Sequence, residues 1–115
     1  MLFRSSPYRA EGFNLPVLEA AACGIPIICT QGGPTDDFVT DEFARRIESR
    51  TSVIAIDGRH ASRLDPGLEH LIVLMTSAIE DSLWRKQAAE AGPRHVCASY
   101  TWDCAVDTLI RKLLN

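Results

Sequence analysis

Short apolar runs recur along the first half of the chain, and they predict strands. Met1–Ser6 and Pro26–Thr30 are two such runs, and Val53–Ile56 is a third that is closed by Asp57-Gly58. Pro26–Thr30 combines apolar and β-branched residues without alternation, a pattern typical of a strand that is buried on both faces of a parallel sheet. No charged residue occurs from Ala20 to Thr35, so this stretch predicts the buried core.

Helical spacing follows the first predicted strand and dominates the second half of the chain. Leu15–Cys23 is expected to be helical, because Pro16 suits a first turn and Gly24 suits the position that ends a helix. Apolar residues at intervals of three and four positions predict the later helices. These cover Gly67–Ile79, Asp81–Ala91 (ended by Gly92-Pro93, with a restart over Arg94–Tyr100) and Trp102–Leu114.

Two stretches give no such pattern. Arg59–Pro66 is expected to be a polar loop, and Phe38–Arg50 cannot be assigned from its sequence. Trp84 and Trp102 are expected to be packing anchors of their helices, rather than a platform for stacking a sugar.

Strands that alternate with helices predict an α/β fold with a parallel sheet and helices on its faces. The length of 115 residues and 12.7 kDa suits a single domain. Residues 1–58 would form a core of strands and loops, and residues 59–115 would be mainly helical. Hydrophobic residues make up 46% and charged residues 23%, which excludes a disordered or coiled-coil chain.

Charge and composition also restrict the partners and the location. A net charge of −3 argues against general nucleic-acid binding, which depends on neutralising phosphates with Lys and Arg. The longest run without a polar side chain, Ala20–Ile28, is too short to span a membrane. No secretory signal pattern opens the chain, and no two of the four cysteines have C-x-x-C spacing. A cytoplasmic protein with free thiols, no bound metal and no transmembrane segment is therefore expected.

The chemistry is expected between two carboxylates, Glu11 and Glu19, which stand eight positions apart in E-G-F-N-L-P-V-L-E. Glu11 would lie in the loop after a strand and Glu19 on the following helix, at the edge where α/β sheets bind ligands. N–H groups at residues 12–15 would suit a diphosphate, and Glu19 could accept two hydrogen bonds from a ribose diol. A solvated loop glutamate and an ordinary helix glutamate remain the alternative reading.

These residues resemble the E-x7-E signature of the group 1, family 4 glycosyltransferases, which are retaining and use nucleotide sugars. The resemblance rests on Ser6–Ala20, on C-G-I-P-I-I at residues 23–28, on Gly32–Phe38 and on Tyr100-Thr101-Trp102 before the last helix. It implies the C-terminal, donor-binding half of a GT-B fold: a Rossmann-like parallel sheet with flanking helices and a helical C-terminal tail.

The resemblance also implies roles for single residues. Glu11 would lie against the donor sugar as the catalytic residue, and Glu19 would hold the ribose hydroxyls. The backbone of Gly12, Phe13, Asn14 and Leu15 would contact the sugar and the diphosphate. The nucleotide-diphosphate sugar would be a substrate, and the resemblance implies neither a cofactor nor a metal.

The chain departs from the family pattern in ways that bear on activity. It begins just before the motif, so an N-terminal acceptor domain and the basic pair that neutralises the diphosphate would both be missing. Asn14 occupies a position where glycine is usual, although asparagine tolerates positive φ better than most residues. A glycosyltransferase portion that is inactive in isolation is the expected function. The alternative is a non-catalytic module that binds a nucleotide sugar or a partner.

Overall fold

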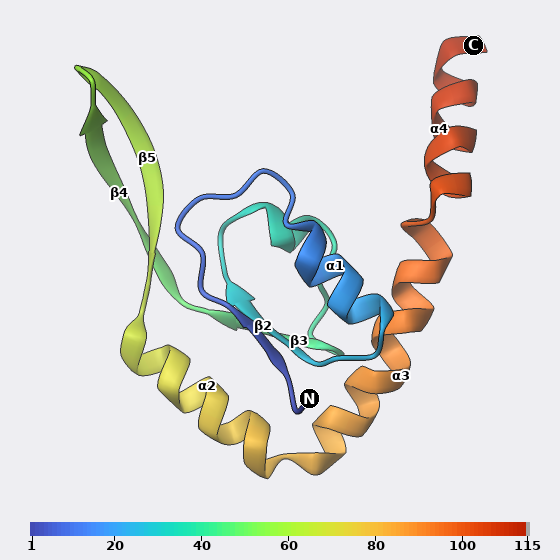
Figure 1. The fold of residues 1–115 in the computed structure, drawn as a ribbon, viewed down its shortest axis with the longest axis horizontal. Helices are drawn as coiled ribbons and strands as arrows, with labels where there is room; N and C mark the ends of the chain where they lie inside the picture. Colours follow the sequence, from blue (N-terminus) through green and yellow to red (C-terminus); the bar gives the residue numbers. More distant parts are fainter. Residues whose placement is uncertain (115) are drawn as a thin grey trace.

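A three-stranded parallel sheet forms the centre of the computed structural model, which describes residues 1–114 (Figure 1). Its strands are β1 (Arg4–Ser6), β2 (Ile27–Thr30) and β3 (Ala44–Ile47), in the order β1-β2-β3. The predicted α/β, Rossmann-like fold is confirmed. β3 lies within the segment that the sequence left unassigned.

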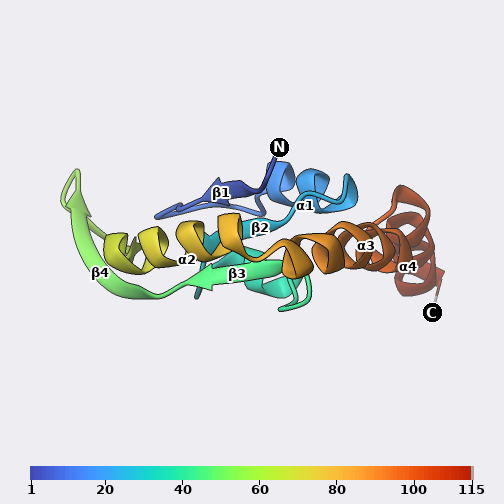
Figure 2. The ribbon, with the colours of Figure 1, turned by 90° about the horizontal axis from the view of Figure 1, so that it is seen from below.

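Helices cover both faces of this sheet. α1 (Leu15–Ala22) packs on β1 and β2, and α2 (Leu68–Glu80) packs on β2 and β3 from the opposite side (Figures 1 and 2). All four residues of β2 are buried, as the charge-free run predicted. The largest fully buried side chains come from the sheet, from α1 and from the turns around β3; they include Phe38, Phe43, Ile27, Ile28, Ile47 and Val17.

The chain leaves the parallel sheet after β3 and forms a long antiparallel hairpin. It consists of β4 (Ser49–Ile56) and β5 (Arg59–Pro66), joined at Asp57 and Gly58, whose φ values are 49° and 76°. The prediction of a polar loop over Arg59–Pro66 is therefore wrong, and the predicted strand Val53–Ile56 belongs to this hairpin instead of the sheet. β5 forms because its backbone pairs with β4 through hydrogen bonds. Its sequence is largely polar, so it carries no apolar pattern that would predict a strand.

A single helix, α3 (Ser82–Ser99), replaces the two predicted segments that Gly92-Pro93 would separate. Two features explain why the helix continues. Gly92 lets α3 approach α1 so closely that a Cβ at this position would lie 2.5 Å from the carbonyl oxygen of Ala21. The carbonyl of Ala89, four residues before Pro93, packs against Gly24, where a Cβ would lie 2.8 Å away. The helix therefore continues where it packs tightly on α1 and on Gly24, although Pro93 cannot donate the usual hydrogen bond to the Ala89 carbonyl.

The last helix, α4 (Trp102–Leu114), has the predicted bounds but projects away from the rest of the molecule (Figure 1). No residue of α4 is buried, and Trp102 is 87% exposed. The expectation that Trp102 anchors its helix is therefore wrong, whereas Trp84 is buried as expected. Within residues 1–114, every helix is too short or too polar to cross a membrane.

Candidate functional site

The loop after β1 ends at Asn14, whose backbone conformation sets the start of α1. Asn14 has φ 70° and ψ 59°, which is the left-handed region, and it occupies the N-cap position of α1. Its side chain is buried and donates a 3.0 Å hydrogen bond from Nδ2 to Oγ of Ser6. Asparagine therefore adopts here the conformation for which glycine is commonly used.

This conformation presents a row of backbone N–H groups at the start of α1. The first intrahelical bonds run from Val17 and Leu18 to the carbonyl oxygen of Asn14. Within residues 1–114, the N–H groups of residues 12–15 donate no hydrogen bond. The positive end of the helix dipole lies at the same place, so the loop is suited to binding an anion.

Tyr8 fixes the beginning of the loop to the turn after β2. Its hydroxyl lies 2.7 Å from Oγ1 of Thr35 and donates to the carbonyl of Thr30 at 3.1 Å, while Oγ1 of Thr30 donates to the Tyr8 carbonyl at 2.7 Å. Burial raises the pKa of Tyr8 above its ordinary value. Gly33 packs on this ring, since a Cβ there would lie 2.5 Å from the Tyr8 hydroxyl oxygen. Gly33 thus has a structural role.

Aromatic rings support the second part of the loop. Phe13 stacks on Phe38 with ring centroids 5.0 Å apart, and Phe38 contacts Tyr100 edge-on at 6.1 Å. The Tyr100 hydroxyl donates to the carbonyl of Asp37 at 3.0 Å. Tyr100 lies between α3 and α4 and belongs to the Tyr100-Thr101-Trp102 motif before the last helix. It therefore supports the loop from a distant part of the sequence.

The structure brings the predicted site residues together only in part. Glu11 lines a cavity of about 330 Å³ beside the loop, together with Tyr8, Arg9, Gly32 and Arg63 among others. The substrate-binding residues predicted from the sequence (Gly12, Phe13, Asn14, Leu15 and Glu19) do not line it. Glu19 is exposed on the second turn of α1. Of the two carboxylates, only that of Glu11 lines this cavity.

Sequence reasoning missed the β4–β5 hairpin as part of this region. Its base packs against the loop, because the N–H of Leu64 donates to the carbonyl of Arg9 at 2.8 Å. Asp65 accepts ion-pair contacts from Arg9 at 3.4 Å and from Arg63 at 3.2 Å. A hydrogen bond from Ser52, followed by these two cations, lowers the pKa of Asp65. The Asp57-Gly58 pair was the one available signal, since Asp-Gly is a common hairpin turn.

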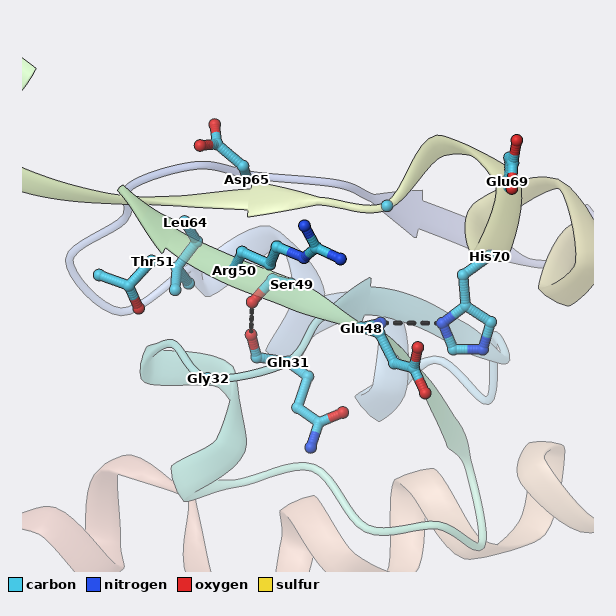
Figure 3. Close-up of a pocket in the computed structure, with 11 residues that line it drawn as sticks. Gln31, Gly32, Glu48, Ser49, Arg50, Thr51, Leu64, Asp65, Glu69 and His70 are labelled. Atoms are coloured by element: carbon cyan, nitrogen blue, oxygen red, sulfur yellow. Dashed lines mark hydrogen bonds between the residues drawn. The ribbon is translucent and has the colours of Figure 1, made fainter. Parts of the chain in front are cut away.

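A larger cavity of about 770 Å³ lies between the hairpin, the turn after β2 and the start of α2 (Figure 3). The hydroxyl of Ser49 donates to the carbonyl of Gln31 at 2.6 Å, and the N–H of Glu48 donates to Nδ1 of His70 at 2.9 Å. Figure 3 marks both hydrogen bonds. None of the predicted site residues lines this cavity. It meets the smaller one at Gly32, Thr51 and Leu64, which line both.

Comparison with known proteins decides the family. Residues 5–109 match the family described as "Family 4 Glycosyltransferase in conflict systems". The chain belongs to this family. The match includes the E-x7-E loop, the hairpin and most of α4, and the glycosyltransferase relationship predicted from the motif is confirmed. Within residues 1–114 of this family 4 member, no group of three His, Cys, Asp or Glu side chains is arranged to hold a metal ion.

Three similar proteins are also glycosyltransferases by name. The chain is 27% identical to the O-antigen chain mannosyltransferase B of Escherichia coli, over 86% of this chain and 22% of that protein. It is 29% identical to a D-inositol 3-phosphate glycosyltransferase of Geodermatophilus obscurus, over 90% of this chain and 19% of that protein. A GDP-mannose-dependent mannosyltransferase of Corynebacterium glutamicum is 25% identical, over 90% of this chain and 23% of that protein. This family 4 chain thus spans about a fifth of the length of each relative.

Proposed function

We propose that this chain is the donor-binding part of a retaining glycosyltransferase and binds a nucleoside-diphosphate sugar at the carboxyl edge of its parallel sheet. The observation that carries the proposal is the left-handed Asn14, which ends the loop so that four consecutive N–H groups lie at the positive end of α1. Such a helix start binds phosphate groups in many nucleotide-binding folds.

The two glutamates would contact different parts of this donor. Glu19 is exposed on α1 and would accept hydrogen bonds from the ribose diol, with its carboxylate oxygens spaced to receive both hydroxyls. Glu11 would lie against the donor sugar, because it lines the cavity next to the loop. The backbone of Gly12, Phe13, Asn14 and Leu15 would contact the diphosphate and the sugar between them.

Transfer would need groups beyond this chain. The relatives are about four to five times as long as this chain, and we propose that an N-terminal domain of the longer protein, or a separate chain, supplies the acceptor site. Stabilising the leaving diphosphate is usually a large catalytic contribution, and loss of one donor group costs about 10²–10³ in rate. The isolated chain should therefore bind the donor weakly and not transfer it. We expect it in the cytoplasm, where its four free thiols would stay reduced.

Calorimetric titration with a nucleoside diphosphate tests the donor-binding proposal. Glu19→Ala should weaken binding about ten- to a hundredfold, because a hydrogen bond to a charged group contributes about 1.5–3 kcal/mol. Glu90→Ala is the matched control, since Glu90 is also an exposed helix glutamate but lies on α3. Equal affinities of the two variants would refute the ribose role. Absence of nucleotide binding by the unmodified chain would favour a non-catalytic interaction module.

A further inference from the structure

The cavity beside Glu11 combines side chains from two distant segments. The cavity is lined by Tyr8, Arg9 and Glu11 from the loop after β1, and by Ser62, Arg63 and Leu64 from β5 of the hairpin. The backbone hydrogen bond from Leu64 to Arg9 joins the two segments directly. The hairpin thus forms one wall of this cavity.

The two adjoining cavities differ in the balance of their charged side chains. Arg9 and Arg63 line the cavity beside Glu11, and both also contact Oδ1 of Asp65, so two cationic side chains face the carboxylates of Glu11 and Asp65. The larger cavity is lined by one arginine, Arg50, and by three carboxylates: Glu48, Asp65 and Glu69. An anionic ligand is therefore accommodated better beside Glu11 than in the larger cavity.

Arg63 is oriented so that part of its guanidinium group remains available. Its contacts within residues 1–114 are made through Nε, which donates to Oγ of Ser52 at 3.3 Å and lies 3.2 Å from Oδ1 of Asp65. Both partners hold the side chain in place, while the two terminal amino groups make no contact with protein acceptors in that part of the chain. Such a pair of amino groups can bind a carboxylate or a phosphate through two parallel hydrogen bonds.

We propose that Arg63 and Arg9 bind an anionic group of the substrate, other than the donor diphosphate, beside Glu11. This inference rests on the proposed function, which assigns the diphosphate to the N–H groups of residues 12–15 and the sugar to Glu11. Of those residues, Glu11 alone lines this cavity, so the cavity lies at the sugar end of the site. The anion is a carboxylate of the transferred sugar or a phosphate of the acceptor.

Ligand-observed saturation-transfer NMR at constant ionic strength distinguishes the two sources. One arm compares UDP-glucuronate with UDP-glucose, and the other compares glucose 6-phosphate with glucose. The anionic member of at least one pair should bind about tenfold more tightly than its neutral partner, as expected for a charge-assisted hydrogen bond. A preference within the first pair assigns the anion to the donor, and a preference within the second assigns it to the acceptor.

Substitutions then locate the preference. Arg63→Gln and Arg9→Gln should each reduce it to about threefold or less, and Arg63→Lys should keep part of it. Arg59→Gln is the matched control, because it removes the same charge from the same strand beside the hairpin turn, outside both cavities. A preference that is absent from the unmodified chain, or that Arg59→Gln reduces as much as Arg63→Gln, overturns the proposal.

Titration with UDP alone separates this proposal from the donor-binding proposal. Arg63→Gln should leave UDP affinity unchanged, whereas Glu19→Ala should weaken it. UDP binding without any anion preference would retain the donor site and reject the anion site. An anion preference without UDP binding would reject the donor site instead.

Discussion

The side chain of Asn14 joins the start of α1 to the end of β1, because its Nδ2 donates a 3.0 Å hydrogen bond to Oγ of Ser6. The same residue has a left-handed backbone, with φ 70°. One residue thus holds the loop closed and also directs the N–H groups of the following turn. Glycine would supply the conformation, but it would not supply the hydrogen bond.

Substitutions at Asn14 should separate these two contributions. Asn14→Ala should lower the free energy of unfolding by about 1–3 kcal/mol, since it loses the hydrogen bond and alanine tolerates the left-handed region less well than asparagine. Asn14→Gly should cost about 1 kcal/mol, because only the hydrogen bond is lost. Denaturant unfolding measures both. Equal losses would show that the backbone conformation contributes nothing.

A substitution at Gly92 tests why α3 continues through Gly92-Pro93. Gly92→Ala should destabilise the chain by about 1–3 kcal/mol, because the new Cβ would lie 2.5 Å from the carbonyl oxygen of Ala21. The usual gain of about 1 kcal/mol for alanine over glycine in a helix is too small to offset this clash. Gly12→Ala is the control, since a Cβ at Gly12 meets nothing within 4 Å. Thermal unfolding that ranks the two variants in the opposite order would contradict the close packing of α1 and α3.

Tyr8 should be more important for stability than Tyr100. Tyr8→Phe leaves the buried partners Thr30 and Thr35 with fewer hydrogen bonds and should cost about 1–3 kcal/mol. Tyr100→Phe removes one exposed hydrogen bond, to Asp37, and should cost about 0.5–1.5 kcal/mol. Chemical denaturation at pH 7 checks the order, and a larger loss at Tyr100 would contradict the role of Tyr8 as the fixed point of the loop.

The buried hydroxyl of Tyr8 also predicts that the chain becomes less stable at alkaline pH. Burial raises the pKa of Tyr8 above 10.0 in the folded chain, so the unfolded chain releases this proton first. Its contribution to stability is complete below the unfolded pKa and is lost as the pH rises from there through the folded pKa. The difference in unfolding free energy between the unmodified chain and Tyr8→Phe should therefore shrink above about pH 10. A difference that stays constant or grows with pH would contradict the burial of a neutral phenol.

β1 should promote self-association. It is the outer strand in the order β1-β2-β3, and Met1 and Leu2 beside it are 90% and 52% exposed. Unpaired parallel edges with apolar neighbours tend to pair with other chains. Sedimentation of the purified chain should show oligomers or aggregates, and Leu2→Lys should reduce them. A stable monomer of the unmodified chain would count against an open edge.

The buried centre of the fold was predictable because its physical signal is local. The run without charges from Ala20 to Thr35 predicted β2, and the Pro16 and Gly24 positions predicted α1 to within one residue. Gly24 has φ 75°, as a glycine that ends a helix commonly has. In both cases the residues that define the element are also the residues that stabilise it.

The remaining elements depend on contacts that the sequence does not display. β3 has arginines at its two central positions, and only its ends, Ala44 and Ile47, are buried. β5 depends on pairing with β4, and α3 crosses Gly92-Pro93 because it packs against α1. The cavity beside Glu11 was missed for the same reason, since three of the ten residues that line it belong to β5.

The most direct test of the account is whether the chain binds a donor without transferring it. Saturation-transfer NMR with uridine, guanosine and adenosine diphosphate sugars should show contact at the ribose and the sugar for at least one of them. The dissociation constant should be in the millimolar range, about −4 kcal/mol, and no sugar should be released to water or to an added acceptor. Saturation by none of the three, or measurable transfer by the chain alone, would contradict the account.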